Sequence, residues 1–252
     1  MGARAIAAAA ALIVSTGLAH AAEIDAMITT AMKAAVDELA PPFERASGHV
    51  LRITYGPSGG LARRLNAGEA ADLVVVDSKV LDELIKQGKV AGDRTDLART
   101  GIGIAVRKGA PKPDVSSPEA LKRALLAAKS IAHTAPAGGG VTAAHVMGVF
   151  EKLGIAAEVT PKVKLAAGGP NGRVSVLVSS GEAEIGLQQV SELMSNPQVE
   201  VIGMLPAQLQ QMTTYSAGTT TNARQMEAAK AFIRYLAAPA AIAIYKTKGL
   251  AL

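Results

Sequence analysis

Apolar and polar residues alternate in short blocks from residue 24 onward, and the blocks switch between two periods. Compact apolar runs such as ADLVVV at residues 71–76 are typical of buried strands, and HVLRITY at 49–55 is a second such run. The segments between them carry apolar residues on one helical face, as in 29–48 and 78–90. Strands and helices in close alternation predict an α/β fold with a mostly parallel sheet and helices on both of its faces.

The alternation breaks at the basic Gly/Pro segment GIAVRKGAPKP and then starts again. A helix is predicted to begin near Ser117, with Pro118 at its first position, and strands are predicted at SIAHT, EVTPKVKL, AEIGLQQ and VEVIGML. We therefore predict two α/β lobes, the first from residues 22–101 and 206–252 and the second from 102–205. Crossings near 99–107 and 205–219 would form a hinge. A single continuous sheet is the alternative.

The first 25 residues have the three parts of a secretory signal peptide. Arg4 is the positive n-region, residues 5–18 form the apolar core, and Ala19-His20-Ala21 is a small-x-small cleavage site. The apolar run is short for a membrane span, so no transmembrane anchor is predicted. The chain has no cysteine, hence no disulfide and no lipid-bearing cysteine. These features predict cleavage near Ala21, after residues 1–21, and a location in the periplasm.

Charge and composition exclude several classes of function. The net charge is +5, but the basic residues are scattered and aromatic residues make up only 3%, so we expect no nucleic-acid partner. The phosphate-binding G-x-x-x-x-G-K-[ST] motif and the dinucleotide motif after the first strand are missing, and no metal-ligand spacing occurs among the four histidines. We therefore expect no cofactor and no metal.

Four polar or glycine-rich turns fall where helices follow strands, and two belong to each predicted lobe. In open α/β sheets, ligands bind at these positions, where free backbone N–H groups favour an anion. Each turn also fits an ordinary helix cap. The turns contain Thr29 and Thr30, Ser58 to Gly60, Gly138 to Thr142, and Asn171 to Arg173.

The second turn, GPSGG at residues 56–60, also matches the G-x-S-x-G motif of serine hydrolases. Such an enzyme needs an acid and a histidine after Ser58, and the candidates are Asp114 with His133 or His145. About a hundred residues follow the later histidine, although the triad histidine is expected after the last strands. We keep a hydrolase as an alternative and favour Ser58 as an anion-binding residue.

Several motifs resemble the molybdate-binding family of periplasmic solute-binding proteins that serve ABC importers. They are SGGLARRLNAGEAADLVVV from residue 58, VFEKLG, GRVSVLVSSGEAEIGL, and AKAFIRYLAAPAAIAIYKTKGL. The resemblance implies a two-lobed fold of type II that closes on a molybdate- or tungstate-like oxyanion. It further implies a monomer that delivers its ligand to an ABC permease in the inner membrane, without enzymatic activity.

The resemblance also implies a set of ligand-binding residues. Hydroxyl donors would be Ser58, Thr30 and Thr142, backbone N–H donors Gly59 and Gly172, and a side-chain amide donor Gln189, where the family has a tyrosine. Thr29 and Arg173 are further candidates. Gln189 and Arg173 favour the alternative that the ligand is a small organic carboxylate, and service to a sensor kinase is a further alternative.

Overall fold

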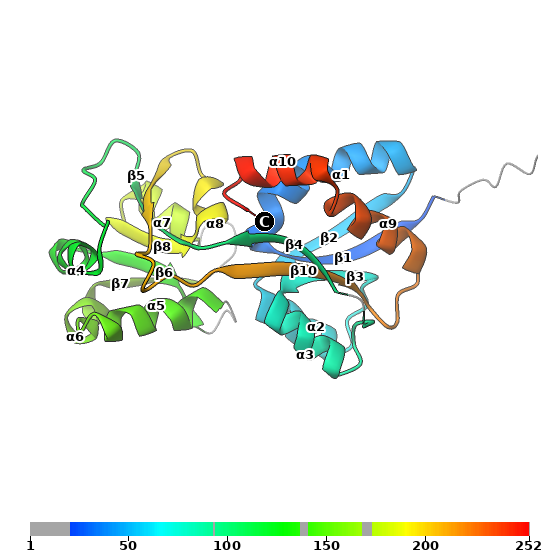
Figure 1. The fold of residues 1–252 in the computed structure, drawn as a ribbon, viewed down its shortest axis with the longest axis horizontal. Helices are drawn as coiled ribbons and strands as arrows, with labels where there is room; N and C mark the ends of the chain where they lie inside the picture. The colour runs from blue at the N-terminus through cyan, green and yellow to red at the C-terminus, as the bar shows by residue number, and fades with distance from the viewer. Residues whose placement is uncertain (1–20, 93, 137–140, 168–172, 252) are drawn as a thin grey trace, which may run out of the picture.

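The computed structural model describes residues 21–92, 94–136, 141–167 and 173–251, in which two five-stranded sheets lie side by side (Figure 1). We call each sheet with its helices a lobe. Lobe 1 has the strand order β2-β1-β3-β10-β4, and lobe 2 has the order β7-β6-β8-β5-β9. The prediction of two α/β lobes rather than one continuous sheet is confirmed.

The strands of lobe 1 are β1 (Glu23–Thr29), β2 (Val50–Gly56), β3 (Leu73–Asp77), β4 (Thr95–Thr100) and β10 (Thr213–Thr219). β1 pairs in parallel with β2 and β3, whereas β10 runs antiparallel to both β3 and β4. The helices are η1 (Thr30–Met32), α1 (Lys33–Ser47), α2 (Ser58–Asn66), α3 (Ser78–Lys86), α9 (Met226–Leu236) and α10 (Pro239–Thr247).

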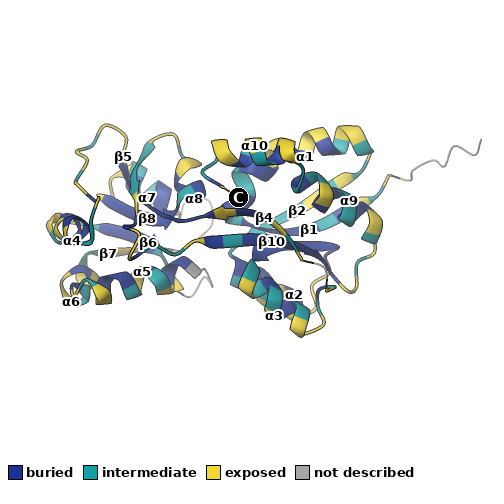
Figure 2. Ribbon diagram, viewed as in Figure 1, coloured by how far each residue is buried: buried dark blue, intermediate teal, exposed yellow. Residues whose placement is uncertain are grey.

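Strand β3 shows why this sheet needs helices on both faces. All five of its residues are buried, and successive side chains point to opposite faces. Leu73 and Val75 pack with α1, α9 and α10, whereas Val74 and Val76 pack with α2 and α3. The outer helices bury one face each and expose the other, as the colours of Figure 2 show.

The strands of lobe 2 are β5 (Ile102–Arg107), β6 (Ile131–Thr134), β7 (Val163–Ala166), β8 (Ile185–Gln189) and β9 (Val199–Met204). β6 pairs in parallel with β7 and β8, and β5 runs antiparallel to β8 and β9. The helices are α4 (Pro118–Ala127), α5 (Val141–Lys152), α6 (Ala156–Val159), η3 (Thr160–Lys162), α7 (Val174–Ser180) and α8 (Val190–Met194). Both sheets are therefore mixed, with a parallel set of three strands.

Local sequence explains the ends of these elements, with one exception to the predictions. Ser117 caps α4 by accepting a hydrogen bond from Ala120, as predicted. The predicted strand EVTPKVKL was wrong in its first half, since only Val163 and the residues after it are extended. Residues 156–162 are helical, because Pro161 has no N–H to give to a sheet and is well suited to the first turn of a helix.

The chain passes between the lobes at Gly101, between β4 and β5, and again between β9 and β10. A side chain at Gly101 would meet the ends of the Met204 and Met212 side chains, which would have to move where the two crossings approach each other. The side-chain amide of Gln210 joins the crossings by two hydrogen bonds of 2.9 Å to the backbone N–H and C=O of Ile102. The two connections are thus held together at the hinge.

The C-terminal segment adds a third contact at the hinge. Ala251 pairs with Arg99 of β4, and the Thr100 hydroxyl donates a hydrogen bond to the Gly249 carbonyl at 3.0 Å. Across the described part of the chain, no single helix is long and apolar enough to span a membrane. α9 and α10 together have the length, but they bend by 60°.

Candidate functional site

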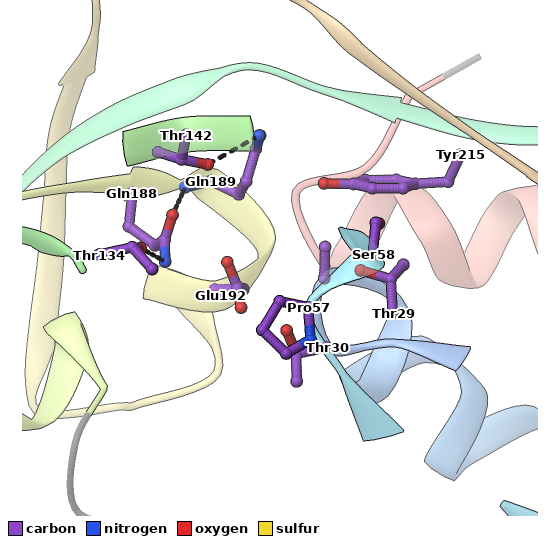
Figure 3. Close-up of a pocket in the computed structure, with 11 residues that line it drawn as sticks. Thr29, Thr30, Pro57, Ser58, Thr134, Thr142, Gln188, Gln189, Glu192 and Tyr215 are labelled. Atoms are coloured by element: carbon purple, nitrogen blue, oxygen red, sulfur yellow. Dashed lines mark hydrogen bonds between the residues drawn. The ribbon is translucent and has the colours of Figure 1, made fainter. Parts of the chain in front are cut away.

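A small polar pocket lies between the lobes, with a volume of about 50 Å³ (Figure 3). Lobe 1 contributes residues that follow β1 and β2, and one residue of β10. Lobe 2 contributes residues at the ends of β6 and β8 and in α5 and α8. The lining residues are Thr29, Thr30, Ala31, Pro57, Ser58, Thr134, Thr142, Gln188, Gln189, Glu192 and Tyr215.

Ser58 is the first residue of α2 and is buried. Its hydroxyl oxygen accepts a hydrogen bond of 3.0 Å from the backbone N–H of Asp77, at the end of β3. Because that bond uses the oxygen as an acceptor, the hydroxyl hydrogen remains free for a ligand. The N-terminus of α2 adds partial positive charge at the same point. Ser58 is thus a fixed, preoriented donor.

Gln189 ends β8 and is 2% exposed. Its amide nitrogen donates to the hydroxyls of Thr142, at 3.3 Å, and Thr213, at 3.1 Å. Since Thr213 belongs to β10, this amide connects lobe 2 to lobe 1. The Gln189 amide oxygen has no hydrogen-bond partner, a costly state for a buried polar atom.

This geometry bears on the donor role predicted for Gln189. Its N–H groups are already used by two threonines, and the amide oxygen that remains is a buried acceptor. Thr142 accepts from Gln189 and keeps its own hydroxyl hydrogen for a ligand. Beside them, the Gln188 amide donates to the Thr134 hydroxyl at 2.5 Å and accepts from the Gln189 backbone.

Glu192 brings a carboxylate to the pocket from α8, and Figure 3 shows it facing Thr30 and Pro57 of lobe 1. Burial raises the pKa of Glu192, while the Thr30 hydroxyl and the charge of Arg173 act in the opposite direction. Tyr215 of β10 points its hydroxyl toward the same space (Figure 3). Burial, together with Glu192 and Asp77, raises the pKa of Tyr215 well above its usual value, so this side chain stays a neutral donor.

Most of the predicted site residues that the structure describes lie around this one pocket. Thr29, Thr30, Ser58, Thr142 and Gln189 line it. Gly59 follows Ser58 in α2 without lining the pocket, and Arg173 is exposed just before α7. Gly172 lies outside the described residues, as do residues 138–140 and 171 of the predicted turns and residues 1–20 of the signal peptide.

The pocket also contains residues that were missing from the prediction, chiefly Glu192, Tyr215 and Gln188. Gln188 directly precedes Gln189, and Glu192 follows it by three residues. The end of β8, where Gln189 was already a candidate, could therefore have pointed to both. Tyr215 has no such signal, because it reaches the pocket from β10, an antiparallel strand that follows the second crossing between the lobes.

The geometry gives no support to a serine hydrolase at Ser58. Neither His133 nor His145 lines the pocket. The His133 ring hydrogen-bonds the backbone carbonyl of Thr134, and the His145 ring hydrogen-bonds that of Leu209. A nucleophile elbow requires a strained turn, yet no described non-glycine residue has a positive φ. Among the described residues no group of three metal-ligating side chains occurs either.

Two lobes joined by two crossings, with a polar pocket between them, are the architecture of a solute-binding protein. The chain belongs to the bacterial extracellular solute-binding protein family, whose model matches residues 24–251. It is a divergent member of the molybdate-binding type with the type II periplasmic binding protein fold, as the resemblance predicted.

Two sequence relatives and one solved structure are similar to this chain. An aconitate isomerase of a Pseudomonas species is 37% identical over 221 residues, which cover 85% of this chain and 82% of the relative. A molybdate-binding protein of Azotobacter vinelandii is 28% identical over 239 residues, covering 93% and 92%. The solved structure of the periplasmic molybdate-binding protein of Azotobacter vinelandii superposes with a TM-score of 0.71 at 21% identity, covering 90% of this chain and 98% of that one. That similarity shows the fold alone.

Proposed function

We propose that this protein binds a small organic carboxylate between its lobes and isomerises a tricarboxylate of the aconitate class. The observation that carries the proposal is the Glu192 carboxylate inside a pocket of hydroxyl and amide groups. The 37% identity to an aconitate isomerase supports it.

Charge is the first reason why Glu192 favours this substrate. Two unit charges 4 Å apart repel by about 4 kcal/mol at the effective dielectric constant of a protein surface. An ionised Glu192 would therefore oppose a bare dianion such as molybdate. The same repulsion acts on the carboxylates of aconitate, but a substrate that gives up a proton from carbon uses the Glu192 carboxylate as a base, which a metal oxyanion cannot do.

Hydrogen bonding is the second reason. Besides Glu192, Gln189 lines the pocket and has a buried amide oxygen without a hydrogen-bond partner. Ser58, Thr142 and Tyr215 offer donors. Donors together with an acceptor match a ligand that has carboxylate oxygens to hold and a methylene proton to give up, which a tetrahedral oxyanion lacks.

The size of the pocket sets a condition on this function. One water needs roughly 10–15 Å³, so about 50 Å³ has room for about three to five waters, or for one carboxylate group. A tricarboxylate fits only when the lobes are further apart. The hinge at Gly101 and Gln210 is where that movement would occur.

The direct test is isomerisation of cis-aconitate by the purified protein, residues 22–252, followed by proton NMR of the vinyl signals. We expect trans-aconitate to form in proportion to protein concentration. A folded preparation that leaves cis-aconitate unchanged would overturn the proposed activity.

A second candidate is capture of a molybdate- or tungstate-like oxyanion for an ABC permease, in the periplasm and without catalysis. The cavity volume favours it, because about 50 Å³ suits a tetrahedral anion without further opening. Its binding residues would be Thr30, Ser58, Gly59, Thr142 and Gln189. Export with cleavage near Ala21, monomeric behaviour, and lobes bounded at residues 101 and 206 belong to both candidates.

Thermal-shift titrations separate the two candidates. A ligand at a hundred times its dissociation constant stabilises the fold by about 2.7 kcal/mol. A shift with molybdate or tungstate but none with cis- or trans-aconitate would support transport. The opposite result would support the carboxylate proposal.

A further inference from the structure

Glu192 has a different setting from every other acid in the described chain: it projects from α8 of lobe 2 into the pocket and faces lobe 1 (Figure 3). Its neighbours across the pocket are hydroxyl groups rather than a strong ion-pair partner. Arg173, whose positive charge acts on it, is itself exposed. The carboxylate thus lies inside the pocket, where it is free to gain or lose a proton.

We propose that Glu192 is the catalytic residue that carries the proton during isomerisation, an inference that rests on the proposed function. Its carboxylate takes a proton from the methylene carbon of cis-aconitate, and the C–H electron pair joins the neighbouring double bond as an allylic anion. The resulting carboxylic acid returns a proton to the far carbon of that system. One C–H bond breaks, one forms, the double bond moves by one carbon, and no oxidant or reductant is needed.

The other pocket residues leave Glu192 as the base. Of the described lining residues only Glu192 and Tyr215 ionise in the ordinary range, and the raised pKa of Tyr215 keeps that hydroxyl protonated. The histidines of lobe 2 are bonded elsewhere. A rival mechanism, in which a thiolate adds reversibly to the double bond, needs a cysteine of this chain as nucleophile, and the chain has none.

The surrounding donors suit the charge that this step creates. Negative charge spreads from the methylene carbon into the adjoining carboxylates as the proton leaves. Ser58, already fixed by Asp77, and the neutral hydroxyl of Tyr215 are oriented before the reaction and need no rearrangement to stabilise that charge.

Thr30 is a positioning residue in this scheme. Its hydroxyl lowers the pKa of Glu192, against the larger effect of burial. Since Thr30 belongs to lobe 1 and Glu192 to lobe 2, the base is oriented only when the lobes are close. Closure would thus complete the catalytic group.

The test compares wild type with Glu192→Gln, using cis-aconitate in the NMR assay. Because general acid–base catalysis contributes about 10²–10⁴-fold, we expect kcat to fall by that factor. Binding of cis-aconitate by calorimetry should persist or tighten, since the glutamine removes a negative charge. Glu151→Gln, at the far, exposed end of α5, is the charge-matched control and should retain full activity.

Three further readouts separate proton transfer from a structural role. Glu192→Asp, which keeps the carboxylate, should restore part of kcat. In D₂O, some product made by the wild type should keep the protium that was removed from the substrate, because a single carboxyl group both takes up and returns the proton. Thr30→Val should move the rise of kcat with pH to higher pH, because the hydroxyl that lowers the Glu192 pKa is gone.

The outcomes distinguish the two proposals. A wild-type protein without isomerase activity removes the proposed function, and this inference with it. An active wild type whose Glu192→Gln variant is folded and equally active overturns Glu192 alone. A Glu192→Gln variant that loses binding as well as turnover assigns the residue to structure and overturns the inference too.

Discussion

Ser58 is the residue on which both candidate functions depend, and its replacement by alanine has two separable effects. In the folded protein its hydroxyl accepts from the buried backbone N–H of Asp77 at 3.0 Å. Removing the hydroxyl leaves that donor without its partner, which costs about 1–3 kcal/mol. We therefore expect Ser58→Ala to lower the free energy of unfolding in urea by that amount.

The second effect is on ligand binding. A hydrogen bond to a charged group contributes about 1.5–3 kcal/mol, and each 1.4 kcal/mol is about a tenfold change in dissociation constant. Loss of the Ser58 donor should weaken binding of a small anion by about 10- to 140-fold. Calorimetry with cis-aconitate and with molybdate measures this for whichever probe the wild type binds.

The control is Ser180→Ala, which removes an exposed hydroxyl at the end of α7 and should change neither quantity. Unchanged affinity in Ser58→Ala, with the expected loss of stability, would show that Ser58 is only a helix-start residue. Unchanged stability would refute the role of its contact with Asp77.

Three other predictions concern stability. Burial raises the pKa of Glu192, so the folded state binds more protons than the unfolded state at pH values between the ordinary and the raised pKa. The free energy of unfolding should therefore fall as pH rises through that window. In urea melts at a series of pH values, Glu192→Gln should flatten this part of the curve. Phe232→Ala, at a fully buried ring 4.8 Å from Phe43, should cost about 3–5 kcal/mol in the same melts, unlike Lys230→Ala. Gly101→Val should cost about 1–3 kcal/mol and change the radius of gyration by X-ray scattering, whereas Gly148→Ala, which has open space, should do neither.

Much of the fold was predictable because its signals are local. The run at 71–76 is buried on both faces in the structure, and continuous apolar residues in a short segment are what such a strand requires. Ser117 with Pro118 likewise announces a helix start within a few residues. Strand β4 was not predicted, since its polar residues Thr95, Asp96 and Arg99 mask the pairing with β10.

The candidate site was predictable only where it follows the same local rule. Thr29 ends β1, Thr30 follows it, and Ser58 comes two residues after the parallel strand β2, so the sequence itself points to the edge where they meet. Tyr215 meets them from more than 150 residues away, on a strand that runs in the opposite direction. No spacing rule in one sequence encodes such a contact.

Glu192 carries the distinction between binding and catalysis in this fold. A pocket that only holds an oxyanion gains nothing from a carboxylate among its donors, and repulsion of about 4 kcal/mol per pair of unit charges at 4 Å would weaken its ligand. A pocket that must remove a proton from carbon needs such a group and can tolerate weaker binding, because only stabilisation of the transition state raises the rate. The same residue is therefore a defect under one function and a requirement under the other.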